Sequence, residues 1–203
     1  MSSIRKDTIE GYNTFIDEQK KVPGEVSATL IQFDDKYEVV YKNKNLSSVP
    51  PLTYETFVPR GSTALLDSVA KGIVDTGKEL AEMRESERPE KVIFIIQSDG
   101  EENSSREYTY EKVAEMINHQ RNKYNWAFIF LGTNLDAIKE ASKFGVTANH
   151  AMTYANNSVG TKFAYAASSN LVSNLRSCEV TDMNNIGFSN EDREKQEELL
   201  NQP

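Results

Sequence analysis

The sequence predicts an α/β fold: a doubly wound, Rossmann-like sheet that is mainly parallel, with one antiparallel edge strand and helices on both faces. Two continuous apolar runs, 92–96 (VIFII) and 126–131 (WAFIFL), are typical of strands buried on both faces of a parallel sheet. Strands alternate with amphipathic helices from residue 91 onward, which indicates right-handed parallel crossovers. A hairpin predicted over residues 25–42 supplies the antiparallel strand.

The other elements follow from apolar spacing and from residues that start or stop helices. A first helix is expected to run to about Lys20, with Ser2 or Ser3 as its N-cap, and Val22-Pro23-Gly24 ends it. Asn125 and Gly145 are expected to end two later helices, and Ser189-x-x-Asp192 to open the last one. Further helices are predicted over 64–83, 110–124, up to 144 and over 158–177, and short extended segments over 55–58 and 148–154.

Composition limits the classes of function. The chain has 203 residues, which fits one domain over 1–177 and a C-terminal extension over 178–203 with a short acidic helix. A net charge of −8 argues against nucleic-acid binding, which needs clustered Lys and Arg. Cys178 is the only cysteine, and no apolar run is long enough to span a membrane. With no signal peptide at the start, a cytoplasmic protein is expected.

Three loops that fall where a strand gives way to a helix carry the chemistry: 61–63 (GST), 99–102 (DGEE) and 132–134 (GTN). Ligands of open α/β sheets bind at this carboxyl edge. The Asp99 carboxylate and the Thr63 hydroxyl suit Mg²⁺, which takes oxygen ligands, and Glu101 and Glu102 would raise the negative potential around the ion. The alternatives are structural: Asp99-Gly100 is a common turn pair, and a Thr before a helix is usually an N-cap.

The segments GSTALLDSV (61–69) and VIFIIQSDGEEN (92–103), in this order of elements, resemble the von Willebrand factor type A domain. The likeness covers about residues 4–177 and is closest to the compact cytoplasmic members of bacteria and their phages. It implies a mainly parallel sheet and a metal-ion-dependent adhesion site in which Thr63 and Asp99 act on Mg²⁺. It further implies a protein partner whose acidic side chain completes the coordination.

One departure from the family concerns its first strand and first loop, which has the pattern D-x-S-x-S. Here Met1-Ser2-Ser3 leads directly into the first helix, and no D-x-S-x-S occurs. The missing strand would lie between the strands at 25–33 and 91–98. Burying five or six large apolar side chains stabilises a fold by roughly 1.5–3 kcal/mol each, which is comparable with the whole stability of a domain, about 5–15 kcal/mol.

Three alternatives for this gap stay open: the working protein starts upstream of Met1, the two flanking strands close on each other, or another chain donates a strand or self-associates. The expected function is a protein-binding module that recognises its partner at the carboxyl edge of the strands, Mg²⁺-dependent only if the first loop is supplied. A metal-free structural or interaction protein with a degenerate site is the alternative. A Mg²⁺-dependent hydrolase or phosphotransferase using Asp99 is less favoured, because no D-x-D pair and no phosphate-binding Gly-rich loop with Lys occurs; we therefore expect no enzyme.

Overall fold

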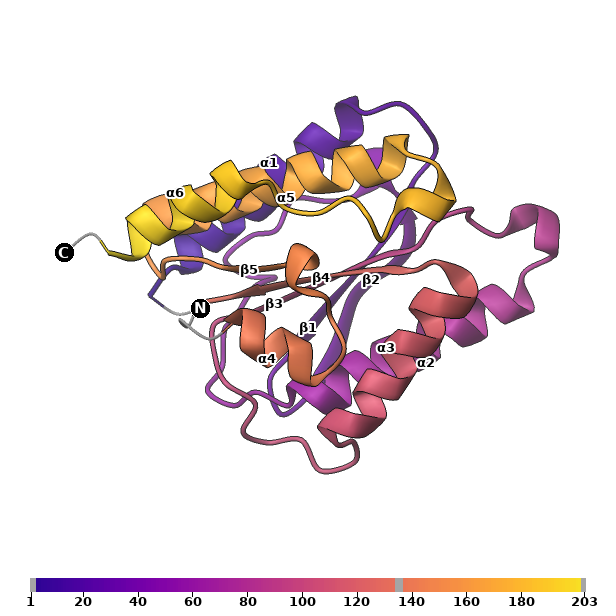
Figure 1. The fold of residues 1–203 in the computed structure, drawn as a ribbon, viewed down its shortest axis with the longest axis horizontal. Helices are drawn as coiled ribbons and strands as arrows, with labels where there is room; N and C mark the ends of the chain where they lie inside the picture. Colours follow the sequence, from indigo (N-terminus) through magenta and orange to yellow (C-terminus); the bar gives the residue numbers. More distant parts are fainter. Residues whose placement is uncertain (1–2, 134–136, 202–203) are drawn as a thin grey trace.

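The computed structural model, which describes residues 3–133 and 137–201, has the expected α/β class, with helices on both sides of mostly parallel strands (Figure 1). The helices are α1 (Arg5–Lys21), α2 (Leu65–Glu82), α3 (Tyr110–Tyr124), α4 (Ala137–Lys143), α5 (Ser158–Ser177) and α6 (Asn190–Leu200). The strands are β1 (Ser27–Phe33), β2 (Tyr37–Asn45), β3 (Ile93–Ser98), β4 (Ala127–Gly132) and β5 (Ala151–Thr153).

The strands form two sheets, because β1 pairs only with β2 and β3 pairs only with β4 within the described ranges. The sheet β3-β4-β5 is parallel throughout, with Ile93 opposite Ala127 and Ser98 opposite Gly132. The hairpin β1-β2 is antiparallel and carries bulges near Ala28 and Leu30. The alternative in which β1 and β3 close on each other is therefore wrong.

The two apolar runs behave differently. Every residue of β4 is buried, as its sequence predicts, because both core clusters pack on it; β3 pairs along its length and β5 over 130–132. In β3 only Ile96 and Ser98 are buried, and 38% of Ile95 is exposed in the middle of the strand. The prediction that β3 is buried on both faces is wrong, because one of its two edges has no strand beside it in the described part of the chain.

The ends of β1 and β3 show that the two strands run in the same direction. Beyond the carboxyl end of β1, the Asp34 carbonyl accepts a 2.7 Å hydrogen bond from the Ala64 amide. The neighbouring Thr63 lies against Gly100, just beyond the carboxyl end of β3. These ends therefore meet at one edge.

At the opposite edge, Arg176 at the end of α5 connects the amino ends of the same two strands. Its guanidinium donates to the carbonyl of Val22, before β1, at 2.8 Å. Its own carbonyl accepts from Lys91 Nζ, before β3, at 2.9 Å. Both strands thus start beside Arg176 and end beside Thr63.

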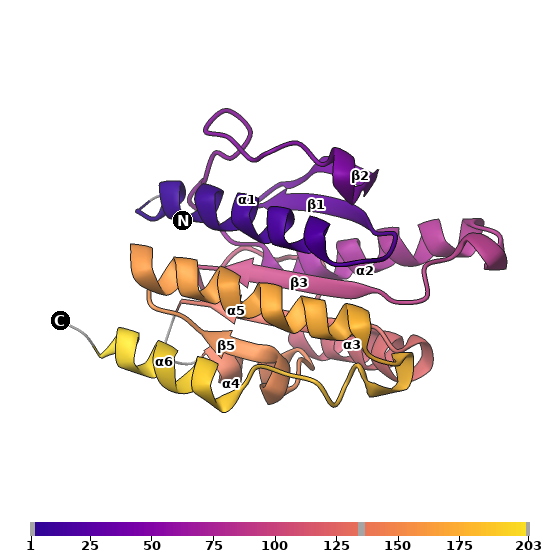
Figure 2. The same cartoon turned by 90° about the horizontal axis from the view of Figure 1, so that it is seen from above.

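Helices α1, α5 and α6 cover one face and α2, α3 and α4 cover the other, as Figures 1 and 2 show. The core divides accordingly. One cluster joins α2, α3 and α4 to the strands through Val69, Ile117, Phe128, Phe130 and Phe144. A second joins α5 to the other face through Ile129, Leu131, Met152, Leu171 and Leu175. A third, smaller cluster attaches the hairpin to α1 through Ile16, Leu46 and Val49, with Phe15, Val26 and Ala28 packed against it.

Several local predictions are confirmed and others are wrong. Asn125 ends α3 in the left-handed region at φ 53°, Gly145 follows α4 at φ 89°, and Ser189 and Asp192 form the capping box of α6. The N-cap of α1 is Ile4 rather than Ser3, without a side-chain hydrogen bond, while Ser2 lies outside the described residues.

Two further segments depart from the expected pattern. Residues 54–56 form a turn, so the extended segment predicted over 55–58 is not a strand. The predicted strand over 148–154 shortens to Ala151–Thr153 behind a single 3-10 turn. None of the described helices has the length and hydropathy needed to cross a bilayer.

Tight packing of α1 on α5 depends on Gly11. A Cβ atom at this position would overlap the ring of Tyr165, which is 8% exposed, whereas a Cβ at Gly61 would meet nothing within 4 Å. The missing side chain therefore permits the close approach of the two helices.

We predict that Gly11→Ala lowers the free energy of unfolding by about 1–3 kcal/mol, because the Tyr165 ring or α1 must shift to relieve the overlap. Urea denaturation measures the change, and Gly61→Ala serves as the matched control. Equal stability of the two variants would contradict close packing at this point.

Candidate functional site

The candidate site lies at the edge where β1, β3 and β4 end. Because β3 and β4 are parallel and in register, the loops that follow Ser98 and Gly132 leave the sheet side by side. The loop before α2 reaches the same edge, where Thr63 meets Gly100. The described residues of the three predicted loops thus come together, while Asn134 lies outside the described residues.

Thr63 is held by a reciprocal pair of backbone contacts. Its amide donates to Asn103 Oδ1 at 2.9 Å, and its carbonyl accepts from the Asn103 amide at 3.1 Å. A Cβ at Gly100 would lie 2.8 Å from Thr63 Oγ1, so only glycine fits beside this hydroxyl without a shift. The residue that caps α2 is Ala64, without a side-chain hydrogen bond, so the structural alternative for Thr63 as the N-cap is wrong.

Asp99 is held from both sides through its backbone. Its carbonyl accepts a hydrogen bond from Thr133 Oγ1 at 3.1 Å, which ties the β3 loop to the β4 loop. Ser98 Oγ donates to the Gly100 carbonyl at 2.9 Å and fixes the turn. Both Asp99 and Thr63 are partly exposed. The fold therefore presents a carboxylate and a hydroxyl at one partly accessible edge.

Glu102 has a structural role that the sequence did not indicate. Its carboxylate accepts from the Leu66 amide at 2.9 Å, the Ser104 amide at 2.9 Å, the Ser105 amide at 2.7 Å and Ser105 Oγ at 2.7 Å. Burial alone would raise the pKa of Glu102, but these hydrogen bonds outweigh it and hold the pKa below its ordinary value. Glu102 thus ties the β3 loop to the first turn of α2.

Asp67 anchors the far half of the same loop. Its carboxylate accepts from the backbone amides of Arg106 at 2.7 Å, Glu107 at 3.0 Å and Tyr108 at 2.9 Å. Sequence reasoning missed Asp67, because an acidic residue in the first turn of a helix is also explained by the helix dipole. Together Asp67 and Glu102 fix the loop that delivers Asp99.

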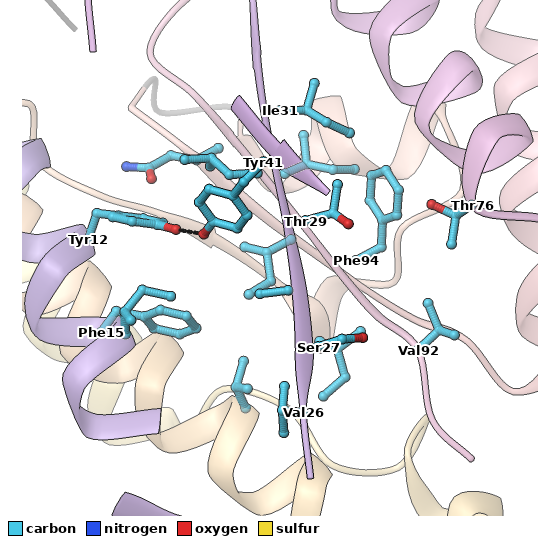
Figure 3. A pocket seen from close by; sticks show the side chains of 18 of the residues that line it. Tyr12, Phe15, Val26, Ser27, Thr29, Ile31, Tyr41, Thr76, Val92 and Phe94 are labelled. Atoms are coloured by element: carbon cyan, nitrogen blue, oxygen red, sulfur yellow. Dashed lines mark hydrogen bonds between the residues drawn. The ribbon is translucent and has the colours of Figure 1, made fainter. Parts of the chain in front are cut away.

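A cavity of about 1250 Å³ lies between β1 and β3 and reaches the candidate site. We call it the inter-strand slot; its two sides are residues 26–34 and 91–99. Figure 3 shows Tyr12 and Phe15 reaching from α1 toward one side of β1, with Phe94 and Thr76 on the other side. Ser62, Thr63 and Asp99 belong to its lining, so the slot and the site are continuous.

An ion pair between a buried carboxylate and an exposed guanidinium closes the carboxyl end of β1. The Asp34 carboxylate, on a residue that is 3% exposed, contacts the Arg60 guanidinium and accepts a 2.6 Å hydrogen bond from the Lys36 amide. Burial would raise the pKa of Asp34, but the Lys36 amide and Arg60 together lower it. Asp34 and Arg60 therefore position the turn and the loop before α2 rather than offering a free carboxylate.

The donor set for Mg²⁺ is incomplete in the part of the chain that the structure describes. Thr63 and Asp99 each offer an oxygen, but no group of three or more His, Cys, Asp or Glu residues that could hold a metal occurs in those ranges. Mg²⁺ prefers six oxygen ligands and keeps several waters, so two protein oxygens fit only a weak site. A further oxygen-bearing segment would be needed for tight binding.

Comparison with known proteins adds no assignment: neither the protein-family models nor the curated proteins include a match to this chain. The geometry of the site is therefore the basis for its interpretation.

We predict that Glu102→Gln lowers the free energy of unfolding at neutral pH by about 1–3 kcal/mol, because a neutral amide replaces a carboxylate that accepts four hydrogen bonds. The folded pKa of Glu102 lies below its unfolded value, so its contribution is complete above the ordinary pKa of 4.5 and is lost as the pH falls through the folded pKa. The difference in the free energy of unfolding between wild type and Glu102→Gln should therefore shrink as the pH falls.

Urea denaturation of wild type and variant, from neutral pH to below pH 4.5, measures this change in the free energy of unfolding. Glu115→Gln is the matched control, because Glu115 is exposed on α3 and its carboxylate pairs with Lys112 of the same helix. A stability difference for Glu102→Gln that does not change with pH would rule out the ionised carboxylate as its cause.

Proposed function

We propose that this chain is a protein-binding module of the von Willebrand factor type A kind that recognises its partner at the carboxyl edge of the strands. The observation that carries the proposal is the hydrogen-bonded meeting of the three loops, in which Thr63 is tied to Asn103 and Asp99 to Thr133. Four carboxylate contacts of Glu102 keep this surface in place without a partner. A preformed polar edge loses little entropy on binding.

Magnesium enters the proposal as a conditional ligand. Thr63 Oγ1 and the Asp99 carboxylate are the groups that would hold it, while the rest of its coordination would come from an added segment and from an acidic side chain of the partner. The bound ion would supply positive charge that attracts such a side chain. In this arrangement metal binding and partner binding strengthen each other.

A metal-free interaction module is the second candidate. It is favoured by the incomplete donor set and by the hydrogen bonds that already occupy Glu102. In this case the same edge binds a protein through direct hydrogen bonds to the loops. A hydrolase or phosphotransferase using Asp99 has less support, since its nearest substitute for a second carboxylate, Glu101, lies on the same loop.

We predict that Mg²⁺ or Mn²⁺ binds weakly to the protein and that Asp99→Ala abolishes the heat of binding in titration calorimetry. Glu115→Ala, which removes an exposed carboxylate elsewhere, should leave the heat unchanged. No heat with the folded wild type would leave only the metal-free form of the proposal.

The protein-binding proposal itself is tested by affinity capture with three baits: wild type, the Thr63→Ala/Asp99→Ala double variant and Glu115→Ala. We expect that the wild-type and Glu115→Ala baits retain a partner protein and that the double variant does not. Identical capture by all three baits would contradict recognition at this edge. Hydrolysis of an activated phosphate ester, lost in Asp99→Ala, would instead favour the enzyme.

A further inference from the structure

We propose that the inter-strand slot is a docking site for one extended apolar segment of a different polypeptide, which inserts between β1 and β3 and joins the two sheets into one. This inference does not rest on the proposed function of the carboxyl edge. It rests on the unpaired strand edges, on the lining of the cavity and on the helices that bridge its two walls.

The two sides of the slot are strand edges without hydrogen-bonded neighbours in the described residues. On their other sides β1 pairs with β2 and β3 pairs with β4. Each facing edge therefore presents backbone amides and carbonyls that a single added strand could satisfy on both sides. Strand addition needs one exposed edge, and this slot offers two, one on each side of the added strand.

The roof and floor of the slot are helices that already pack without an inserted strand. On one face, Gln19 of α1 donates to the Ser169 carbonyl of α5 at 2.9 Å, and Gly11 lies against Tyr165. On the other face, α2 approaches both sheets at Gly72, where a Cβ would meet Phe94 of β3 at 2.8 Å and Ile31 of β1 at 3.8 Å. The two sheets are thus bridged by helices on both faces, while no ladder joins β1 to β3 in the described residues.

The chemistry of the lining defines the occupant. Apolar side chains from helices and strands line both faces, among them Phe15, Ile16, Ala28, Ile31, Phe94 and Ile95. Because alternate side chains of a strand point to opposite faces, both sets of side chains of the occupant would meet walls that are mainly apolar, with Ser168 on one face and Thr76 on the other as polar members. The occupant is therefore a continuous apolar segment, about as long as β3 and β1, which have 6 and 7 residues.

A second copy of this chain fits the slot poorly. All five of its described strands are already paired with at least one neighbour, so a copy in this state has no free strand to insert. Its most apolar strand, β4, is buried along its whole length. These facts favour a different polypeptide that carries an unpaired apolar segment.

The experiment uses two labelled peptides of this chain's own strand sequences, each flanked by lysines for solubility. The test peptide copies residues 127–132 (AFIFLG), a sequence that is buried on both faces in β4. The control peptide copies residues 37–42 (YEVVYK) of β2, whose two charged residues, Glu38 and Lys42, do not suit a mainly apolar slot. Fluorescence anisotropy measures binding to the intact protein, and amide hydrogen exchange locates it.

Two variants place the binding in the slot. Ile95→Lys introduces a charge at a slot residue that is already 38% exposed, and Val159→Lys makes the same change at a residue that is 60% exposed on α5 and outside the slot lining. We expect the test peptide to slow exchange in β1 and β3 and to raise the Tm by about 5–10 °C at a hundredfold excess over its Kd. Ile95→Lys should weaken its affinity by about tenfold or more, since the ammonium group would be desolvated, and Val159→Lys should not.

Three results would overturn the proposal. The first is equal binding of the two peptides, or no binding of the test peptide, to wild type, a result that does not depend on either variant folding. The second is slowed exchange in β1 and β3 only when the 127–132 sequence is fused ahead of residue 3, and not when it is added as a free peptide. That result would assign the slot to a covalently attached strand. The third is concentration-dependent dimerisation of the free protein that Ile95→Lys abolishes, which would assign it to a second copy.

Discussion

The packing of α1 against α5 is the constraint on which the rest of the structure depends. Gly11 allows the close approach to Tyr165, and the buried Gln19 side chain bonds to the backbone of α5. Since the hairpin is attached to α1 through its own small core, this contact fixes the position of β1 relative to the parallel sheet. The two sheets are thus joined through helices, with no ladder between β1 and β3 in the described ranges.

The same constraint explains the state of the candidate site. The carboxyl ends of β1 and β3 are held at one edge. Thr63 and Asp99 therefore reach a common surface even though the space between β1 and β3 is open. Asp67 and Glu102 accept backbone hydrogen bonds that make the loop geometry independent of any ligand. The edge is therefore ordered but incomplete: it offers oxygen ligands from two loops, while the slot beside it lies open.

Much of this architecture could be predicted from the sequence, because its signals are local. The apolar run of β4, the end of α3 at Asn125 and the capping box at Ser189 each depend on neighbours within a few residues. The joint position of Thr63 and Asp99 was implied by the type A resemblance, whereas the extended segment expected just before residue 61 is a turn. The burial of β3 could not be predicted, since an apolar run does not show whether a neighbouring strand exists, and Ile95 is exposed for that reason.

The structural roles of Asp67, Glu102 and Asn103 were beyond sequence reasoning for a related cause. Each of these side chains forms a hydrogen bond with a residue about 40 positions away, and Glu102 also accepts hydrogen bonds from backbone amides of its own loop. Neither kind of contact leaves a periodic pattern in the sequence. Glu102 was expected to contribute charge around an ion, and the structure instead uses its carboxylate as a backbone acceptor. The type A resemblance pointed to the edge at which the three loops meet but not to the contacts that build it.

The most direct test of this account is residue-resolved amide hydrogen exchange of the free protein, because exchange reports which strand edges are paired. The account predicts the strongest protection over residues 130–132 of β4, which pair with β3 on one side and with β5 on the other. In β1 and β3 it predicts slow exchange only for amides bonded to β2 and β4, and fast exchange for those facing the slot. Uniform protection of β1 and β3, equal to that of β4, would contradict an open slot between the two sheets.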